Sequence, residues 1–580
     1  MIKFDNFSYS FPQKDLYNKI SFTLEDGQHC AFIGASGTGK STLIDILMDP
    51  EKYMFAGTLE INPDCRIGYV SQFPQLDKTN EITVFDYIAE EFIKLQKELA
   101  SICAEMETSP GTDDTDLLLE KYQQAANAFD AISGDDFESN INKKLNLANL
   151  FTHKNIRVSE LSGGEFKLIQ VIKEMLTSPD VIIMDEPDVF LDFENLTALK
   201  NLINTHKGIM LIVTHNRYLL NHCFNKIVHL ENTDLQEFDG KYIDYHFALL
   251  QSKIEQQELA NAYTEEIERN EILSVKLRSA ATNNAEAARG KALSARVKIL
   301  ERLEATRIEA PYVDLKQPEI RLVTEGKIEE NTALRVRDYS VAFDDILLEK
   351  VAFEIKSTDK VALIGANGTG KTTLLRAIFS DNHSSIEIND DTEVAYLSQL
   401  HGEMLNESNT IQEEFFEAGF ETMDKIRSYL SNYGFAREAM DQKIGSLSGG
   451  ERNILQLAKI SAGQANLLLL DEPTSHLDTY SQIALEKAIK EYNGAILMIS
   501  HDFYSIVNCM DYVLIIEDKT VRRMSIKNFK KRIYASHFDK DDSELEQKKK
   551  SVEMKIALAL KDTDPSHAKI LSEELKEMIK

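Results

Sequence analysis

The sequence has 580 residues, of which 43% are hydrophobic, and it carries a formal net charge of −30 at pH 7. This length is enough for several folded domains, and no run of about 18 apolar residues predicts a membrane-spanning helix. Five scattered cysteines without C-x-x-C spacing argue against a zinc site and a disulfide framework. Because the N-terminus also lacks a charged and then apolar signal segment, we expect a cytoplasmic protein.

The first motif along the chain is a phosphate-binding loop at residues 34–41, which fit G-x-x-x-x-G-K-[ST]. An apolar run at 31–33 predicts a buried strand before it, and 42–47 predict a helix after it. Glycines let consecutive backbone N–H groups turn toward phosphate oxygens, Lys40 would reach the outer phosphates, and Ser41 would bind Mg²⁺. The predicted nucleotide-binding residues here are Gly34, Ser36, Gly37, Gly39, Lys40, Ser41 and Thr42.

Two more motifs follow in the first half. Residues 161–165 read Leu-Ser-Gly-Gly-Glu before a predicted helix at 166–176, and this loop again offers N–H groups to an anion. Four apolar residues at 181–184 then predict a buried strand that ends in Asp185 and Glu186. Such a strand would deliver Asp185 to Mg²⁺ and Glu186 to an attacking water.

The middle of the chain has a different composition. Residues 242–308 are rich in Glu, Lys, Arg, Ala and Leu, with apolar positions at three- and four-residue steps and a break at 281–284. We therefore predict a long antiparallel helical hairpin, with arms of about 30 residues that reach about 45 Å. Residues 269–307 contain nine basic and four acidic side chains, so the hairpin is locally basic. An inert spacer is the alternative, but a spacer needs no basic tip.

The second half repeats the motif series of the first. Residues 365–372 form a second phosphate loop after a predicted strand at 361–364, and 447–451 repeat Leu-Ser-Gly-Gly-Glu before a predicted helix at 452–462. A buried strand at 467–470 ends in Asp471 and Glu472. The repeat predicts a second nucleotide site, with the loop residues Gly365, Asn367, Gly368, Gly370, Lys371, Thr372 and Thr373.

This series resembles the ATP-binding cassette superfamily over most of both halves. The resemblance implies an α/β fold with two P-loop ATP-binding cassette domains in tandem, joined by the long antiparallel α-helical hairpin, and a Mg²⁺-dependent ATP hydrolase. It also implies head-to-tail closure, in which the signature loop of each cassette completes the nucleotide site of the other. The first site would combine Lys40, Ser41, Gln72, Asp185, Glu186 and His215 with Ser448, Gly449, Gly450 and Glu451; the second would combine Lys371, Thr372, Gln399, Asp471, Glu472 and His501 with Ser162, Gly163, Gly164 and Glu165.

The resemblance also implies a role for each residue type. The predicted catalytic residues are the two glutamates that act on water and the two switch histidines that contact the terminal phosphate: Glu186, Glu472, His215 and His501. The predicted magnesium ligands are Ser41, Gln72, Asp185, Thr372, Gln399 and Asp471. Phe11 and Phe343 fall where the superfamily places an aromatic residue that stacks on adenine.

Tandem cassettes with a basic hairpin between them resemble the ABC-F family, whose members bind the ribosome. In that family the hairpin enters the tRNA exit site and contacts rRNA and tRNA. The first cassette is also 41 residues longer than the second between glutamine loop and signature. This surplus, near 95–136, resembles the family's arm subdomain, or it is an ordinary helical elaboration. The resemblance implies a monomeric translation switch, and protection against ribosome-targeting antibiotics stays open; an ATP-hydrolysing subunit of a drug exporter is the alternative.

We predict the first cassette at 1–241, the helical linker at 242–332, the second cassette at 333–535 and a charged helical extension at 536–580. The two cassettes depart differently from the family pattern Asp-Glu-Pro-Thr-Asn-His-Leu-Asp. Residues 471–478 are close to it, whereas 185–192 have Val189 and Phe190 in place of polar groups. Residues 214–217 read Thr-His-Asn-Arg and 500–503 read Ser-His-Asp-Phe. This asymmetry predicts unequal hydrolysis at the two sites.

Overall fold

The structure is a computed structural model that describes residues 2–11, 14–35, 37–62, 65–72, 81–108, 114–189, 191–231, 233–242, 298, 320–322, 324, 331–343, 346–380, 383–398, 402, 404–463, 465–537, 552, 555–556 and 565–579, with scattered residues from 244 to 273. Ser36, Phe190 and Gln399 lie outside the described residues, as does most of the predicted hairpin. The chain divides into two compact units, Met1–Tyr242 with Pro318–Ile533, and Ile243–Gln317 with Tyr534–Lys580. Both cassettes belong to the first unit.

The first cassette contains a three-stranded antiparallel sheet, in the order β2-β1-β4, and a six-stranded sheet, in the order β5-β6-β7-β3-β8-β9. In the larger sheet the neighbouring strands are parallel except β8 and β9. The strands are β1 (Ile2–Phe11), β2 (Lys14–Leu24), β3 (His29–Gly34), β4 (Ala56–Ile61), β5 (Ile67–Val70), β6 (Val181–Asp185), β7 (Ile209–Val213), β8 (Lys226–Glu231) and β9 (Asp234–Asp239). The carboxyl ends of β3, β6 and β7 therefore meet at one edge, where ligands bind in sheets of this type.

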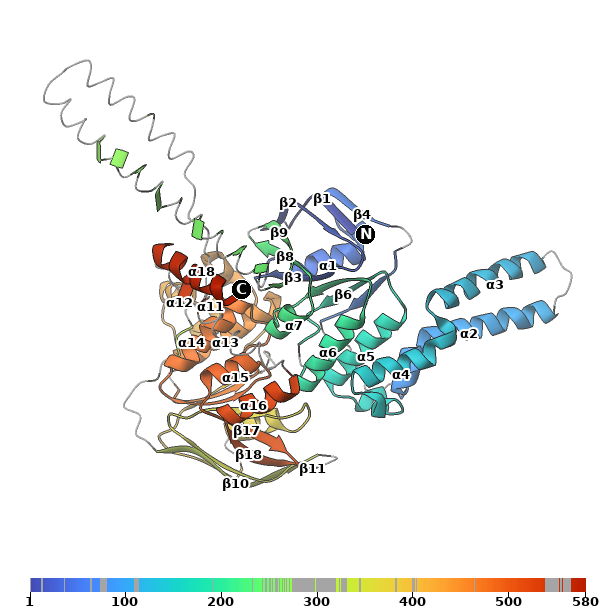
Figure 1. Cartoon of the computed structure of the whole chain (residues 1–580). Coiled ribbons are helices and arrows are strands. Elements are labelled where there is room, and N and C mark those ends of the chain that lie inside the picture. Colours follow the sequence, from blue (N-terminus) through green and yellow to red (C-terminus); the bar gives the residue numbers. More distant parts are fainter. Residues whose placement is uncertain are drawn as a thin grey trace, which may run out of the picture. The chain divides into compact units, whose positions relative to one another are not determined.

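The helices of the first cassette include two long ones in the predicted insertion. The helices of this cassette are α1 (Lys40–Met48), α2 (Val84–Thr108), α3 (Asp114–Ala131), α4 (Phe137–Leu147), α5 (Gly163–Leu176), α6 (Phe193–Thr205) and α7 (Arg217–His222). Helices α2 and α3 run side by side, away from the sheets (Figure 1), and a small apolar cluster that includes Ile102, Leu118 and Ala125 joins them. The predicted helix at 166–176 is confirmed as the body of α5.

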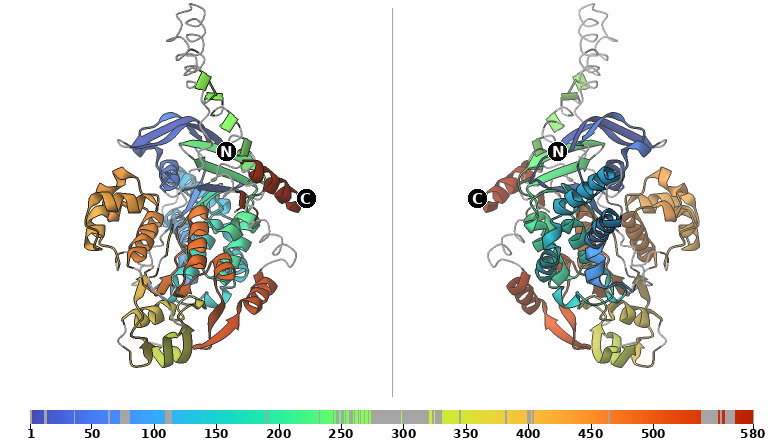
Figure 2. Two further views of the ribbon diagram at one scale, coloured as in Figure 1. Left: turned by 90° about the vertical axis from the view of Figure 1, so that its left-hand side faces the viewer. Right: turned by 90° about the vertical axis from the view of Figure 1, so that its right-hand side faces the viewer.

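The second cassette repeats this topology, with sheet orders β11-β10-β13 and β14-β15-β16-β12-β17-β18. Its strands are β10 (Thr332–Ala342), β11 (Ile346–Lys356), β12 (Lys360–Ile364), β13 (Ile386–Ile388), β14 (Val394–Leu397), β15 (Leu467–Asp471), β16 (Ala495–Ile499), β17 (Tyr512–Glu517) and β18 (Thr520–Ser525). Its helices are α10 (Lys371–Ser380), α11 (Ile411–Glu417), α12 (Met423–Ser431), α13 (Gly449–Ala462), α14 (Thr479–Glu491), α15 (Phe503–Cys509) and α16 (Ile526–His537). Helices α11 and α12 form a lobe to one side (light orange in Figure 2).

Each cassette has its own apolar core between the two sheets and the helix that follows the phosphate loop. In the first, the rings of Phe4 and Phe22 stack 4.4 Å apart, and Leu43 and Ile44 of α1 are fully buried. Strands β6, β7, β15 and β16 are buried at every position, because parallel strands covered on both faces consist of continuous apolar runs. The sheets thus form rigid supports for the loops at their carboxyl ends.

The second unit is described in part. Those of its residues between 244 and 273 that the structure describes are helical, and α18 (Pro565–Ile579) starts at a proline, as is common at a first helical position. Buried apolar side chains in it include Ile254, Ile556 and Leu575. Within the described part of the chain, no helix has both the length and the apolar character that crossing a membrane requires.

Candidate nucleotide-binding sites

The phosphate loop of the first cassette runs from the end of β3 to the start of α1. Gly37 and Gly39 have φ values of 74° and 104°, in the left-handed region that glycine tolerates best. The Tyr17 hydroxyl, which lies under this loop, donates a hydrogen bond to the Gly39 carbonyl, and a Cβ on Gly39 would lie 2.9 Å from that hydroxyl. Burial raises the pKa of Tyr17, so the hydroxyl stays protonated and keeps the loop in place.

The lysines of the two phosphate loops adopt the same arrangement. Lys40 Nζ donates to the carbonyls of Gly34 and Ala35, both at 2.8 Å, and Lys371 Nζ makes the two equivalent contacts at 2.9 Å. Burial lowers the pKa of both ammonium groups, against the attraction of nearby carboxylates that include Glu186 and Glu472. Two buried cations that contact neutral carbonyls are suited to pair with anionic phosphate.

The two strand-end aspartates lie beside the hydroxyls of the phosphate-loop helices. Asp185 and Asp471 are 4% and 1% exposed. Burial raises the pKa of Asp185 to about 6, and the Ser41 hydroxyl, which donates to it, acts in the opposite direction. Burial likewise raises the pKa of Asp471, and the Thr372 hydroxyl opposes the rise. A cation bound beside either aspartate would stabilise its ionised form, which burial disfavours.

These oxygen groups fit Mg²⁺, a hard cation that prefers carboxylate and hydroxyl ligands. Asp471 Oδ1 is buried, and among the described residues it has no hydrogen-bond partner, as expected of an atom that a cation would satisfy. Gln72 was also predicted as a magnesium ligand, but in the structure its amide Nε2, a donor, faces the carboxylate of Glu186. Its predicted counterpart Gln399 lies outside the described residues. Ser41 and Asp185 in one cassette, and Thr372 and Asp471 in the other, are thus the residues that could hold the ion.

The glutamates that follow these aspartates have an unusual backbone. Glu186 and Glu472 have φ values of 44° and 50°, which few non-glycine residues adopt. Their N–H groups donate to Val213 and Ile499, at 2.9 and 3.0 Å, so that the neighbouring strand fixes each turn. Such strain costs about 1–3 kcal/mol and is found mainly at functional sites.

In the first site the glutamate is bound by both cassettes. Gln72 Nε2 donates to Glu186 Oε2 at 2.6 Å, and His476 Nδ1, from the second cassette, lies 3.1 Å from the same oxygen. Burial opposes ionisation of Glu186, but the hydrogen bond from His476 and neighbouring positive charges, Lys40 among them, lower its pKa to about 2. Glu186 is therefore a carboxylate held by two donors.

In the second site the corresponding carboxylate has fewer contacts among the described residues, which do not include Gln399. Glu472 Oε2 accepts a hydrogen bond from the backbone N–H of His501 at 3.3 Å. Glu472 Oε1 lies 3.5 Å from the ring nitrogen His501 Nε2, without hydrogen-bond geometry. Burial and the neighbouring Asp471 raise the pKa of Glu472. Burial lowers the pKa of His501 to about 3 and also lowers that of His215, so both switch histidines are neutral at pH 7.

The signature loops are the N-terminal caps of two helices. Ser162 accepts the N–H of Glu165 at the start of α5 while Glu165 accepts the N–H of Ser162, and Ser448 and Glu451 do the same at α13. This reciprocal capping follows from Ser and Glu three residues apart. Gly163 and Gly164, like Gly449 and Gly450, form the first turns, where unpaired N–H groups favour an anion.

Several contacts place the predicted partners of different cassettes together. A Cβ on Gly37 of the first phosphate loop would lie 3.4 Å from Glu451 Oε1 of the second signature. In the opposite direction, the N–H of Asn367, in the second phosphate loop, donates to Asp192 Oδ2 at 3.3 Å. The charge of Asp478 acts on Lys40 across the same boundary. These contacts bring each phosphate loop next to residues of the other cassette, and the head-to-tail completion of the nucleotide sites stays a prediction.

The remaining predicted residues lie at the ends of β1 and β10 and around the two phosphate loops. Phe11, at the end of β1, is 46% exposed, and Phe343, just beyond β10, is 72% exposed. An exposed ring face is what stacking on a base needs. Thr42 and Thr373 lie in the first turns of α1 and α10, Gly34 ends β3, and Gly365, Gly368 and Gly370 lie in the loop before α10.

Three residues at these sites were not predicted from the sequence. His476 and Tyr17 make the contacts described above, and Lys167 of α5 is buried, with Nζ donating to the carbonyls of Ser71 and Gln72. Lys167 and His476 each occupy a motif position that differs between the repeats, where the other half has Asn453 and Phe190. Comparing the two halves position by position would have singled out these two.

Comparison with known proteins gives consistent matches. The family model described as ABC transporter matches residues 17–189 and 348–475. The chain is 28% identical over 523 residues to the energy-dependent translational throttle protein EttA of Escherichia coli (strain K12), covering 88% of this chain and 90% of that protein. It is 28% identical over 536 residues to ABC transporter F family member 5 of Arabidopsis thaliana, covering 89% and 75%. These relatives confirm the resemblance to the ABC-F family.

A solved structure has a similar fold. The archaeal ribosome recycling factor aABCE1, in its complex with the ribosomal stalk protein aP1, matches with a TM-score of 0.52 and 17% identity over 92% of each chain. This likeness supports the tandem-cassette fold.

Proposed function

The chain belongs to the ABC transporter family of ATP-binding cassette proteins and is an ATP hydrolase, and we propose that it is a cytoplasmic, ribosome-bound factor of the ABC-F type that uses ATP as a conformational switch in translation. The observation that carries the switch is the group formed by Gln72 and Glu186 of the first cassette with His476 of the second. Because one site contains residues of both cassettes, separating them would dismantle it.

In the proposed cycle the side chains act on ATP in both sites. Lys40 and Lys371 would turn from their own loop carbonyls to the outer phosphates, where they offset the charge of the transferred phosphoryl group. Glu186 and Glu472 would orient or deprotonate the attacking water. His215 and His501 would contact the terminal phosphate. Mg²⁺, held by the hydroxyl and aspartate of each cassette, would neutralise charge between the phosphates when bound.

Closure of the cassettes would follow from ATP binding, because each signature loop donates to a phosphate held by the other half. The capped starts of α5 and α13 present N–H groups for this contact. Loss of the terminal phosphate after hydrolysis removes the shared ligand, and the cassettes would reopen. The cycle therefore alternates between two arrangements of one chain.

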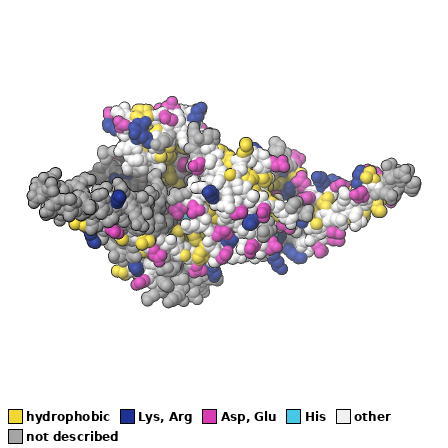
Figure 3. Space-filling view, turned by 90° about the horizontal axis from the view of Figure 1, so that it is seen from above, with side chains coloured by type: hydrophobic (Ala, Val, Ile, Leu, Met, Phe, Trp, Pro, Cys, Tyr) yellow, Lys and Arg dark blue, Asp and Glu magenta, His cyan; other side chains and the backbone are white. Residues whose placement is uncertain are grey.

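The link to translation is supported by the relatives and by charge. EttA is named for translational throttling and aABCE1 for ribosome recycling. On the face in Figure 3, acidic and basic side chains are interspersed over the residues that the structure describes, which gives that face no broad basic surface for RNA. We assign contact with rRNA and tRNA near the exit site to the segment 269–307, because it contains nine basic and four acidic side chains, and further ribosome contact to α2 and α3. Protection against ribosome-targeting antibiotics would be one use of the same binding mode.

Sedimentation with purified ribosomes tests this function. The double variant Glu186→Gln, Glu472→Gln should bind ATP without hydrolysing it and co-sediment with ribosomes when ATP is present. The control is Lys40→Met, Lys371→Met, which removes both phosphate-loop charges and should stay in the supernatant. Failure of the glutamine variant to co-sediment, with ATP binding intact, would refute the proposal, and ATP-dependent recovery in membrane fractions would favour the exporter subunit instead.

A further inference from the structure

His476 connects the signature loop of the second cassette to the glutamate of the first. Its Nδ1 lies 3.1 Å from Glu186 Oε2 and 3.2 Å from Gln72 Nε2, and the His476 and Glu186 side chains are 10% and 17% exposed. A carboxylate accepts hydrogen bonds and does not donate them, so the tautomer that fits has its proton on Nδ1. Glu186 Oε2 then accepts from both the imidazole and the amide.

Residues of the second cassette fix the turn that contains His476 and pack against its imidazole ring. His476 has a φ of 60°, within a turn in which Ser475 N donates to Glu472 O at 3.1 Å. Asn453 of α13 donates to the carbonyls of Pro473 and Ser475, both at 3.0 Å. A Cβ on Gly449 would lie 3.1 Å from His476 Cγ, so the ring packs directly against the first glycine of the signature loop.

We propose that His476 is a positioning residue that the second cassette supplies to the hydrolysis site of the first, so that Glu186 is aligned only while the second signature loop is docked. The proposal rests on the role assigned above to Glu186. It requires no change in the chemistry of hydrolysis, because His476 touches the glutamate and the glutamine-loop amide and acts through them. It makes the first site dependent on a donor from the other cassette.

The sequence of the corresponding loop in the first cassette differs at the position of His476. The loop of the first cassette that corresponds to 471–478 has Phe190 where the second has His476, and phenylalanine has no hydrogen-bonding group. Glu472 Oε1 has no hydrogen-bond partner within the described part of the chain. The proposed dependence is therefore a property of one site, and it gives a physical cause for unequal hydrolysis.

The test measures each site separately. In a Glu472→Gln background the remaining turnover belongs to the first site, and in a Glu186→Gln background it belongs to the second. His476→Ala should lower the ratio of first-site to second-site turnover by about 10- to 100-fold, the range expected for a misplaced catalytic group. The loss should appear in kcat, while KM and the affinity for a fluorescent ATP analogue change little, because His476 does not hold the nucleotide.

Two further variants separate positioning from a structural role. His476→Asn places an amide donor at the same bond distance from Cα and should restore most of the ratio, whereas Ser475→Ala, at the neighbouring loop position, should leave turnover and thermal unfolding unchanged. Equal losses at both sites, loss of ATP affinity, or no rescue by asparagine would overturn the proposal. A Glu472→Gln protein without any turnover would also overturn the proposal. The proposed function would then still be tested independently by ribosome co-sedimentation, which needs no turnover.

Discussion

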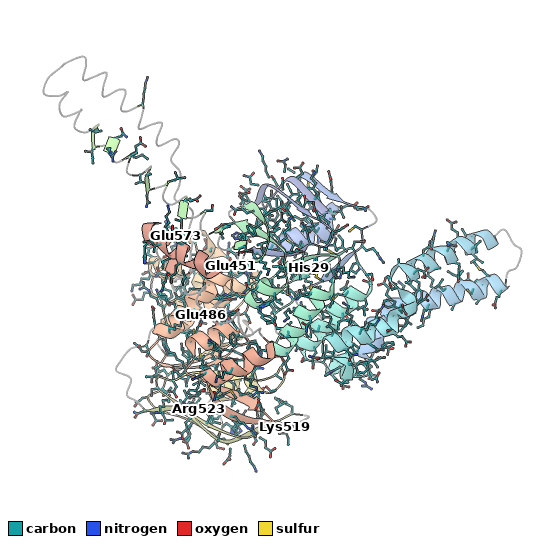
Figure 4. The ribbon with its side chains drawn as sticks, viewed as in Figure 1. His29, Glu451, Glu486, Lys519, Arg523 and Glu573 are labelled. Carbon is teal, nitrogen blue, oxygen red and sulfur yellow. The ribbon has the colours of Figure 1, made fainter. Side chains whose placement is uncertain are left out.

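Replacing Arg217 by methionine should weaken the contact between the two cassettes by a predictable amount. Arg217 begins α7 in the first cassette, and its Nη1 lies 3.5 Å from Oε1 of Glu486 in α14 of the second (Glu486 is labelled in Figure 4). Their side chains are 9% and 1% exposed. Ser505 Oγ and Asn508 Nδ2 also donate to the Glu486 carboxylate, at 3.3 and 3.1 Å.

The magnitude follows from burial. Removing one partner of a buried ion pair costs about 3–5 kcal/mol, because the other charge remains without compensation. The two neutral donors to Glu486 place Arg217→Met near the lower end, at about 3 kcal/mol. Burial raises the pKa of Glu486 despite Arg217, whereas the attraction of Glu486 and other acidic groups raises the pKa of Arg217 despite burial, so desolvation and pairing act against each other in this pair. We therefore expect the double variant Arg217→Met, Glu486→Leu to lie within about 1 kcal/mol of wild type.

The assay is calorimetric unfolding, combined into a double-mutant cycle. A loss of 3 kcal/mol corresponds to a fall in Tm of about 6–12 °C for a domain of cassette size, and the transition should split as the cassettes uncouple. The matched control is Lys487→Met, also in α14, whose pair with Glu491 is 60% and 67% exposed and should contribute less than about 0.5 kcal/mol. Additive effects of the two single substitutions, with a coupling energy near zero, would show that the pair does not form in solution.

Three smaller predictions follow from single residues. Tyr17→Phe removes one of two donors to the Gly39 carbonyl, to which the Leu43 N–H also donates at 3.0 Å, and should lower stability by about 0.5–1.5 kcal/mol in urea unfolding, with weaker ATP binding at the first site. Lys167→Met should reduce first-site turnover about 10-fold in the Glu472→Gln background, since Gln72 loses its anchor. His206 has a pKa lowered by burial and nearby charges to about 4, from 6.5, so the unfolded chain binds more protons between these values and stability falls as pH drops through that window. His206→Gln should recover about 1 kcal/mol of that loss after allowance for solvent screening, and an unchanged pH profile would exclude His206 as its cause.

Much of the local structure around each candidate nucleotide site could be predicted from the sequence because it depends on neighbours in the chain. The predicted strands at 31–33 and 361–364 are parts of β3 and β12, and the predicted helices at 166–176 and 452–462 are parts of α5 and α13. A glycine with positive φ or a serine that caps a helix needs no distant partner, so its motif is sufficient. The predicted division of the chain into four segments stays a prediction.

What the sequence by itself determined, then, is two copies of a strand, loop and helix that hold phosphate, each with a carboxylate-ended strand beside it. The tertiary structure decided which residues of the two copies meet. His476 lies 290 positions from Glu186 and 404 from Gln72, and Arg217 and Glu486, which are 269 positions apart, are buried together. Such contacts form only between surfaces of the folded cassettes. They depend on the shape and charge of both surfaces rather than on the residues that are adjacent in the sequence.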